Sequence, residues 1–441
     1  MKYRYNMIQL LVMIVMAVFL FTCNASARSI SLTIEDLFQQ VEVDNTEIRI
    51  ACNEREVAFM RERAEKDCWL PDIGLMLEED YLGNAYVLDR DLGGGSRSPM
   101  THWGNSLSIS VYQPIYTGGE LTARVARADA QYRIADNNVE LIKIRMKMTV
   151  VKLYLELAKN LNLLGVYDEN IRITCGLIDE MKARASQGLV LANDVTRYEL
   201  NLSNLKYDRL AVVNSISNLN YSLVSYLQMN DTDTIVPAID FDRINFSAMP
   251  LPEWRKLSRA ESPVLKYYEF QWNLLKSSVK LFKSDRLPKI GIGAAASLSA
   301  PITTHTPVLD KNLGKWYVGL KISFTPSAFY KSTHKIQAAT LERDHLIDSY
   351  KGSEEEIDRN LDRAYRNYIE AIEHVWTQRK NVDLASENYR IVERRYGSDL
   401  SLLTDMLDAS ASKLDAEMRL VNARVDVLYY YFQLKYISGV I

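Results

Sequence analysis

The sequence predicts an α+β protein in which one structural unit of long helices and amphipathic strands is used twice. Residues 70–74, Leu-Pro-Asp-Ile-Gly, return 217 residues later as residues 287–291, Leu-Pro-Lys-Ile-Gly. Residues 45–48, Asn-Thr-Glu-Ile, have their counterpart at the same offset in residues 262–265, Ser-Pro-Val-Leu. A period of about half the chain predicts a twofold internal repeat. Two copies rarely close a symmetric object alone, so we expect several chains to assemble.

Residues 1–27 have the features of an export signal. An unbroken apolar run covers residues 10–21 and follows a positively charged start. Ala-Ser-Ala at 25–27 fits the small-x-small cleavage pattern, so we expect the mature chain to begin at Arg28. The alternative is lipidation at Cys23, although the Phe and Thr before it fit a lipidation signal poorly.

The composition is that of a folded protein and excludes several functions. Hydrophobic residues make up 47% and charged residues 25%, with a net charge of −3 and no basic block that would suggest nucleic acid. The 5 histidines are scattered without metal-ligand spacing, and no nucleophile motif occurs. We therefore predict neither an enzyme nor a metal or cofactor site. No later run reaches the ~18 apolar residues of a spanning helix.

Long helices occupy most of the chain. The stretches expected to be helical are 33–66, 118–187, 189–228, 252–283, 327–396 and 400–438. The longest would reach roughly 100 Å at ~1.5 Å per residue, too long for an ordinary globule. Spacings of seven, four and three connect Leu407, Leu414, Met418, Val421, Val425, Leu428 and Phe432. This heptad pattern predicts helices that supercoil side by side.

Four strands with one apolar and one polar face are predicted, at 70–79, 103–112, 289–300 and 315–325. Leu107, Ile109 and Val111 alternate with three serines. Half-buried strands of a soluble sheet give the same pattern, but export without a spanning helix favours a transmembrane barrel. Four strands cannot close, and unpaired edges in lipid are costly. Three chains would supply twelve strands.

The expected organisation has four parts. Residues 1–27 are the signal peptide, 28–228 the first repeat, 229–251 an equatorial linker and 252–441 the second repeat. The first repeat contains a helix, a β-hairpin and a long helical hairpin.

Several motifs resemble the TolC-type outer-membrane efflux family. They are Gln-Pro-Ile-Tyr-Thr-Gly-Gly at 113–119, the paired strand starts at Leu70 and Leu287, and the turns that follow Arg184 and Arg395. The resemblance covers residues 32–439. It implies a trimer that forms a twelve-stranded outer-membrane β-barrel, with four strands per protomer, continued by a long periplasmic α-helical coiled-coil barrel. It also implies partners: a periplasmic adaptor, an inner-membrane transporter and outer-membrane lipid.

The resemblance assigns roles to individual residues. The strand-to-helix junction would use Pro114, Gly118 and Gly119. The helix tips that contact the adaptor would use Arg184, Gly188, Leu189, Tyr396 and Gly397. The second junction, Thr-Pro-Ser-Ala-Phe-Tyr at 325–330, lacks the glycine pair. The second tip would use Gly397 where the first uses Gly188.

Three carboxylates are candidates for gating the periplasmic mouth: Asp194, Asp405 and Asp408. Asp405 and Asp408 share a helix face near the second tip, so a threefold assembly would place them in two charged rings. The alternative is that they are solvated acids near a helix start, where the helix dipole favours negative charge.

The function expected from the residues and the resemblance is an exit duct of a tripartite efflux pump or type I secretion system. The alternative is a soluble periplasmic coiled-coil interaction protein without a barrel. A secreted enzyme would need a pocket of convergent polar groups, and the sequence indicates none.

Overall fold

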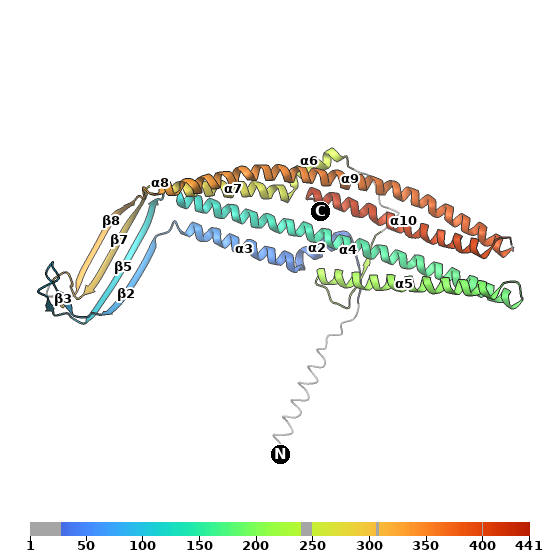
Figure 1. Cartoon of the computed structure of the whole chain (residues 1–441), viewed down its shortest axis with the longest axis horizontal. Helices are drawn as coiled ribbons and strands as arrows, with labels where there is room; N and C mark the ends of the chain where they lie inside the picture. Colours follow the sequence, from blue (N-terminus) through green and yellow to red (C-terminus); the bar gives the residue numbers. More distant parts are fainter. Residues whose placement is uncertain (1–27, 240–248, 306–307, 399) are drawn as a thin grey trace, which may run out of the picture. The chain divides into compact units, whose positions relative to one another are not determined.

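The computed structural model describes residues 28–239, 249–305, 308–398 and 400–441 (Figure 1). The expected signal peptide with Cys23, and part of the expected linker, lie outside these residues. The chain forms two compact units. Unit 1 contains residues 28–50, 140–263 and 354–441, and unit 2 contains residues 51–139 and 264–353.

Unit 2 contains a four-stranded antiparallel sheet with the order β2-β5-β7-β8. The strands are β2 (Asp72–Tyr81), β5 (Trp103–Tyr116), β7 (Lys289–Ala300) and β8 (Leu313–Ser323). Each lies where the alternating pattern predicts it, within two residues at its start. Strand β5 continues four residues further than predicted, because it stays paired with β7 beyond the register shift at Pro114.

The register gives this sheet one apolar and one polar face. In one row, Leu75 pairs with Ile109, Ile109 with Ala296, and Ala296 with Trp316. The rows on either side of it, on the same face, contain Ile73, Val111, Ala294 and Val318, and Leu77, Leu107, Leu298 and Gly314. The opposite face contains Met76, Ser108, Ser297 and Lys315 in its central row. Since side chains alternate along a strand, these apolar and polar sets point to opposite faces in the middle of the sheet, and polar residues such as Glu79 and Asn105 join the apolar face only near its end.

Most of the remaining chain is helical, and four helices are very long. These are α4 (Glu120–Ser186), α5 (Ala192–Tyr226), α9 (Thr333–Gly397) and α10 (Leu403–Ser438). The shorter helices are α2 (Ile34–Asp44), α3 (Thr46–Asp67), α6 (Leu251–Glu261), α7 (Pro263–Ser284) and α8 (Ala328–Lys331). Within the described residues, none of these helices has an apolar stretch long enough to cross a membrane.

Three of the helices expected to be continuous are interrupted: 327–396 divides at Ser332 into α8 and α9, and the other two break at the repeated motif of residues 45–48 and 262–265. The stretch 33–66 breaks at Asn45, whose side-chain oxygen accepts a hydrogen bond from the Glu47 backbone N–H at 2.9 Å. The stretch 252–283 breaks before Pro263, which has no N–H to continue the helical ladder. A local cap and a proline therefore override the helical periodicity at equivalent places.

Two hydrophobic clusters form the core of unit 1. One lies between α6, α9 and α10 and includes Trp254, Leu361, Tyr368 and Leu434. The other lies where the hairpins α4–α5 and α9–α10 turn, and it includes Met181, Tyr198, Tyr389 and Met406. We call the second one the tip cluster.

Two small sheets were not expected from the sequence. In unit 1, β1 (Ser29–Leu32) pairs in parallel with β6 (Thr234–Pro237). The buried Tyr154 hydroxyl ties them together, because it donates to the Leu32 carbonyl at 2.5 Å and accepts from the Ala238 N–H at 3.0 Å. Burial raises the pKa of this hydroxyl to about 12, so it remains protonated. In unit 2, β3 (Ala85–Val87) and β4 (Ser96–Ser98) form a short hairpin.

Candidate functional sites at the strand–helix junctions and the helix tips

The first strand-to-helix junction depends on two glycines in left-handed conformations. Gly118 has φ 65° and Gly119 φ 83°, directly before α4. A Cβ on Gly118 would lie 2.6 Å from the Cβ of Leu287 and 3.1 Å from the Ser284 carbonyl. A larger residue at Gly118 would therefore collide with the end of α7 as well as adopt a strained backbone. Pro114 lies where the β5–β7 register shifts.

The second junction turns without glycine and is held by an arginine. After β8 the chain enters the single turn α8, which ends at Lys331, and Ser332 separates it from α9. Arg286 donates from Nε to the Ser332 hydroxyl at 2.7 Å and from Nη2 to the Thr333 hydroxyl at 2.9 Å. Its guanidinium carbon also lies 5.9 Å from the centre of the Phe329 ring. Sequence reasoning missed Arg286, because its partners lie about 46 residues further along the chain.

The first helix tip ends in a Schellman motif with glycine in the left-handed position. Gly188 has φ 77°. Its N–H donates to the Ala185 carbonyl at 3.0 Å, and the Leu189 N–H donates to the Arg184 carbonyl at 3.0 Å. These two bonds satisfy carbonyls that the end of α4 would otherwise leave open. Arg184, Gly188 and Leu189 are thus parts of one turn.

The second tip is built differently from our expectation for Gly397. That residue is the last of α9 and has no positive φ, so it does not take the role of Gly188. The turn is closed instead by the Leu400 N–H, which donates to the Arg395 carbonyl at 2.8 Å. The Arg395 guanidinium donates back to the Leu400 carbonyl at 3.2 Å. The prediction of positive φ at Gly397 was wrong because α9 continues through this residue.

The structure brings the two tips together through Arg184 and Tyr396. The guanidinium carbon of Arg184 lies 5.8 Å from the centre of the Tyr396 ring, and Tyr396 also packs on the tip cluster. Tyr198 and Tyr389 lie inside that cluster, and burial raises the pKa of both hydroxyls. All four helix ends therefore meet around one apolar core.

The candidate gating acids have different surroundings. Asp405 is exposed and accepts hydrogen bonds from the Leu402 N–H and the Ser401 hydroxyl, both at 3.0 Å, and so caps the start of α10. Asp408, one turn further, is exposed and has no hydrogen bond or ion pair within the described residues. Asp194 is half-buried in the first turn of α5. Of the two acids at the second tip, Asp405 therefore has a local capping role and Asp408 has none within the described residues.

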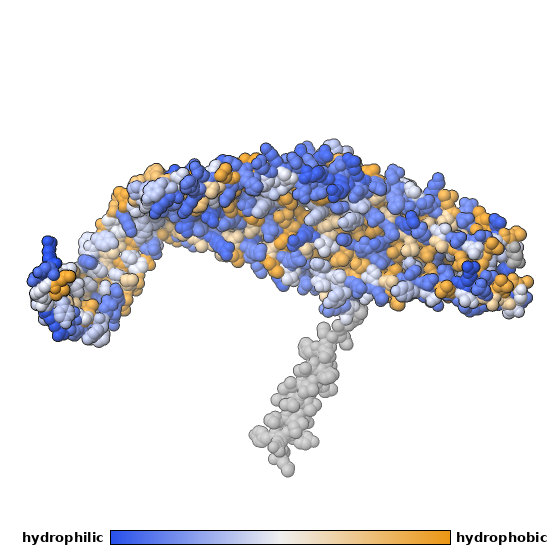
Figure 2. All heavy atoms as spheres, viewed as in Figure 1, coloured by the Kyte–Doolittle hydropathy of each residue, from blue (hydrophilic) through white to orange (hydrophobic). Residues whose placement is uncertain are grey.

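Exposed leucines gather at the tips, and sequence reasoning identified only Leu189 among them. The exposed fractions are 62% for Leu189, 71% for Leu191, 68% for Leu400 and 70% for Leu402. Hydrophobic residues are visible on the surface at the ends of both hairpins (Figure 2). The signal was available, since leucine in a turn of four to six residues is unusual unless something covers it.

The described residues contain no group of three or more His, Cys, Asp or Glu side chains placed to hold a metal ion.

Comparison with known proteins agrees with this architecture. Residues 254–440 match the outer membrane efflux protein family. The outer membrane protein TolC of Salmonella enteritidis is 21% identical over 91% of this chain and 81% of its own length. TolC of Escherichia coli strain K12 is 20% identical over 94% of this chain and 83% of its own length.

Solved outer-membrane proteins share the fold. VceC of Vibrio cholerae superimposes with a TM-score of 0.75 at 13% identity, over 92% of this chain and 96% of VceC. The MtrE outer membrane channel of Neisseria gonorrhoeae gives 0.73 at 16% identity, over 92% and 88%. CusC gives 0.79 at 11% identity, over 95% and 96%. Residues 254–440 thus match the outer membrane efflux protein family, and over most of its length the chain is similar in sequence to TolC and shares the fold of solved outer-membrane channels.

Proposed function

We propose that three copies of the chain assemble into an exit duct with a twelve-stranded barrel in the outer membrane. The observation that carries this proposal is the four-stranded sheet. Its edge strands, β2 and β8, have no further partner within the described residues, and the three central rows of one face are apolar. An unpaired strand edge in lipid costs several kcal/mol per backbone group. A second and a third copy would pair both edges and close the barrel.

The surfaces of the helices support assembly below the barrel. On α3, Ile50 and Val57 are seven residues apart and about half exposed, at 52% and 50%. On α5, Leu200, Tyr207 and Tyr221 follow the same seven-residue spacing and are 62–73% exposed. An exposed heptad stripe favours packing against another helix. We infer that these stripes join neighbouring copies into an α-helical coiled-coil barrel.

The helix tips are the proposed docking surface for a periplasmic adaptor, which would connect the duct to an inner-membrane transporter. Arg184, Gly188, Leu189, Tyr396 and Gly397 lie in or beside the two turns, with exposed leucines around them. The duct would serve a tripartite efflux pump or a type I secretion system, and it would move solutes without altering them chemically. Asp405, Asp408 and Asp194 are the proposed acids of the periplasmic mouth.

The mass of the detergent-extracted protein tests the assembly. We expect about three times the mass of one mature chain, and single-channel conductance after reconstitution into planar bilayers. The competing soluble coiled-coil protein would leave the apolar face of the sheet in water, and carbonate would extract it from membranes. A stable detergent-soluble monomer without conductance would rule out the duct.

A further inference from the structure

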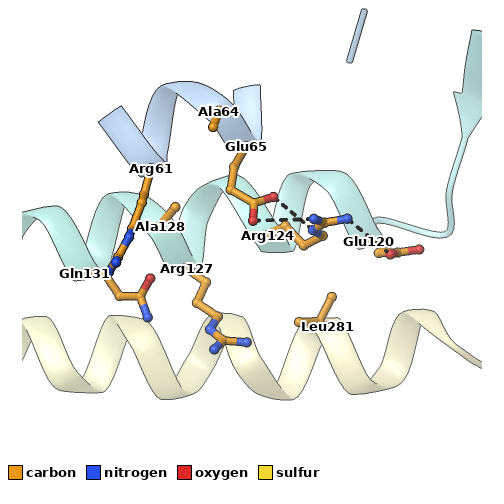
Figure 3. Close-up of a pocket in the computed structure, with 9 residues that line it drawn as sticks. All are labelled: Arg61, Ala64, Glu65, Glu120, Arg124, Arg127, Ala128, Gln131 and Leu281. Carbon is orange, nitrogen blue, oxygen red and sulfur yellow. Dashed lines mark hydrogen bonds and ion pairs between the residues drawn. The ribbon is translucent and has the colours of Figure 1, made fainter. Parts of the chain in front are cut away.

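A hollow of about 530 Å³ lies between α3, α4 and α7 in unit 2, and arginines dominate its polar lining (Figure 3). Arg61 reaches from α3 across to Gln131 on α4, and Arg127 points from α4 toward α7 (Figure 3). Arg124 lies beside them. The volume is within the range of small-molecule sites.

The charges in the hollow do not balance. Both carboxylates of the lining already have cationic partners, since Arg124 lies 2.9 Å from Glu65 and 3.9 Å from Glu120, and Glu120 also pairs with Lys289. Arg61 and Arg127 have no hydrogen bond or ion pair within the described residues, and Arg127 is half-buried. Two unpaired guanidinium groups therefore face a cavity that contains no unpaired carboxylate.

The hydrogen bonding of the sheet establishes the order of the elements as seen from its apolar face. The Leu82 N–H donates to the His102 carbonyl at 2.8 Å, so the even-numbered residues of β2 bond directly to β5. These residues belong to the serine-bearing face. In an upward strand of L-residues, a residue whose side chain points away from the viewer directs its N–H and C=O to the left. With the helices below, β5 and its continuation α4 therefore lie to the left of β2 and α3.

The handedness of α4 then shows which way the hollow opens. In this view α4 runs downward, because it follows β5. Its side toward α3 carries Tyr132, whose ring centre lies 5.5 Å from that of Phe59. Seen along its axis from start to end, a right-handed helix turns clockwise, and successive residues are roughly 100° apart. The residues that face the hollow therefore lie roughly 100° counter-clockwise from the side that carries Tyr132. They form the stripe Glu120, Arg124, Arg127 and Gln131. It points away from the apolar face, so the hollow opens on the side of the serine-bearing face.

We propose that Arg61, Arg127 and Gln131 form a binding station for the phosphate or carboxylate group of an anionic solute inside the duct. The inference rests on the proposed function, because the serine-bearing face lines the lumen only if the apolar face meets lipid. A threefold assembly would place six unpaired guanidinium groups around the passage, near the end of the barrel at which α3, α4 and α7 join the strands. Guanidinium groups bind phosphate and carboxylate oxygens through paired, charge-assisted hydrogen bonds. A ring of such groups concentrates anions at the passage.

Block of single channels by inorganic triphosphate tests this station. In the wild-type duct we expect triphosphate to reduce conductance. The double variant Arg61→Gln with Arg127→Gln should need at least about tenfold more triphosphate for half block, since each charge-assisted hydrogen bond is worth more than a neutral one. The double lysine variant should keep part of the block because it keeps the charge.

The matched control is Arg133→Gln on the same helix. Arg133 lies on the opposite side of α4 and pairs with Asp129 at 3.0 Å, so its loss should leave block unchanged. Calorimetric titration of triphosphate into detergent-purified trimer gives a second measure that does not require conductance.

The outcomes separate this inference from the duct itself. Conducting trimers with equal block and equal triphosphate binding in wild type and double variant would overturn the arginine station and leave the duct intact. A wild-type protein that forms neither trimers nor channels would overturn both.

Discussion

The Arg184 guanidinium carbon lies 5.8 Å from the centre of the Tyr396 ring, so the end of α4 contacts the end of α9 across the two helical hairpins. Such a cation–π contact is worth about 0.5–2 kcal/mol. We expect Tyr396→Ala to loosen the proposed periplasmic mouth and raise resting single-channel conductance. Tyr396→Phe keeps the ring and should behave like wild type. Equal conductance in the two variants would show that the contact does not help to close the mouth.

Two neighbouring positions on β5 should respond in opposite ways to the same charge. Ile109 lies between Leu75 and Ala296 on the apolar face, and Ser108 lies between Met76 and Ser297 on the polar face. Ile109→Arg should cost roughly 2–4 kcal/mol at mid-membrane depth and reduce assembled trimer. Ser108→Arg should assemble normally. Heat-resistant trimer in extracted membranes is the measurement, and the reverse order would mean that the proposed lipid-facing side is the wrong one.

Asp405 and Asp408 can now be tested separately, because only Asp405 caps a helix. Asp408→Asn should weaken cation block from the periplasmic side, and the melting temperature should stay unchanged. Asp405→Ala should also lower the melting temperature, since it removes the acceptor of two hydrogen bonds; capping interactions are worth about 0.5–2 kcal/mol. If Asp408→Asn keeps the wild-type cation block, Asp408 is a solvated surface acid and not part of a pore ring.

The two tip glycines should differ in their tolerance of alanine. Gly188 has φ 77°, a conformation that costs an L-residue about 1–2 kcal/mol, so Gly188→Ala should destabilise each protomer by that amount. Gly397 is helical, and Gly397→Ala should be neutral or stabilise by up to about 1 kcal/mol. Chemical denaturation of both variants gives the comparison. Equal losses would mean that the first tip does not depend on its left-handed residue.

The long elements could be predicted because their signals are periodic and local. Strand β7 was expected at 289–300 and occupies those residues, and α4 was expected at 118–187 and spans Glu120–Ser186. The alternation also identified the face of the sheet on which Ile109 lies. These features depend on side-chain patterns of period two or 3.6, which a single sequence displays directly.

The features that were missed depend on partners far away in the chain. The parallel pairing of β1 with β6 joins segments about 205 residues apart, and neither is long enough to show alternation. Arg286 stands outside any motif, so its role at the second junction appears only when Ser332 and Thr333 are placed beside it. For the candidate site, the sequence located the acids near the tip but could not show that Asp405 caps a helix and Asp408 does not.

The pairing of β1 with β6 has a consequence for the order in which the protein folds. Ser29–Leu32 precedes the first hairpin in the chain, and its partner Thr234–Pro237 follows only after the whole hairpin. The Tyr154 hydroxyl needs both segments, since it bonds to Leu32 and to Ala238. The N-terminal strand must therefore wait unpaired while α4 and α5 emerge. The first hairpin can be anchored at its base only when the chain begins its second half, so in the proposed trimer a subunit would be ready to assemble only after more than half of its chain is available.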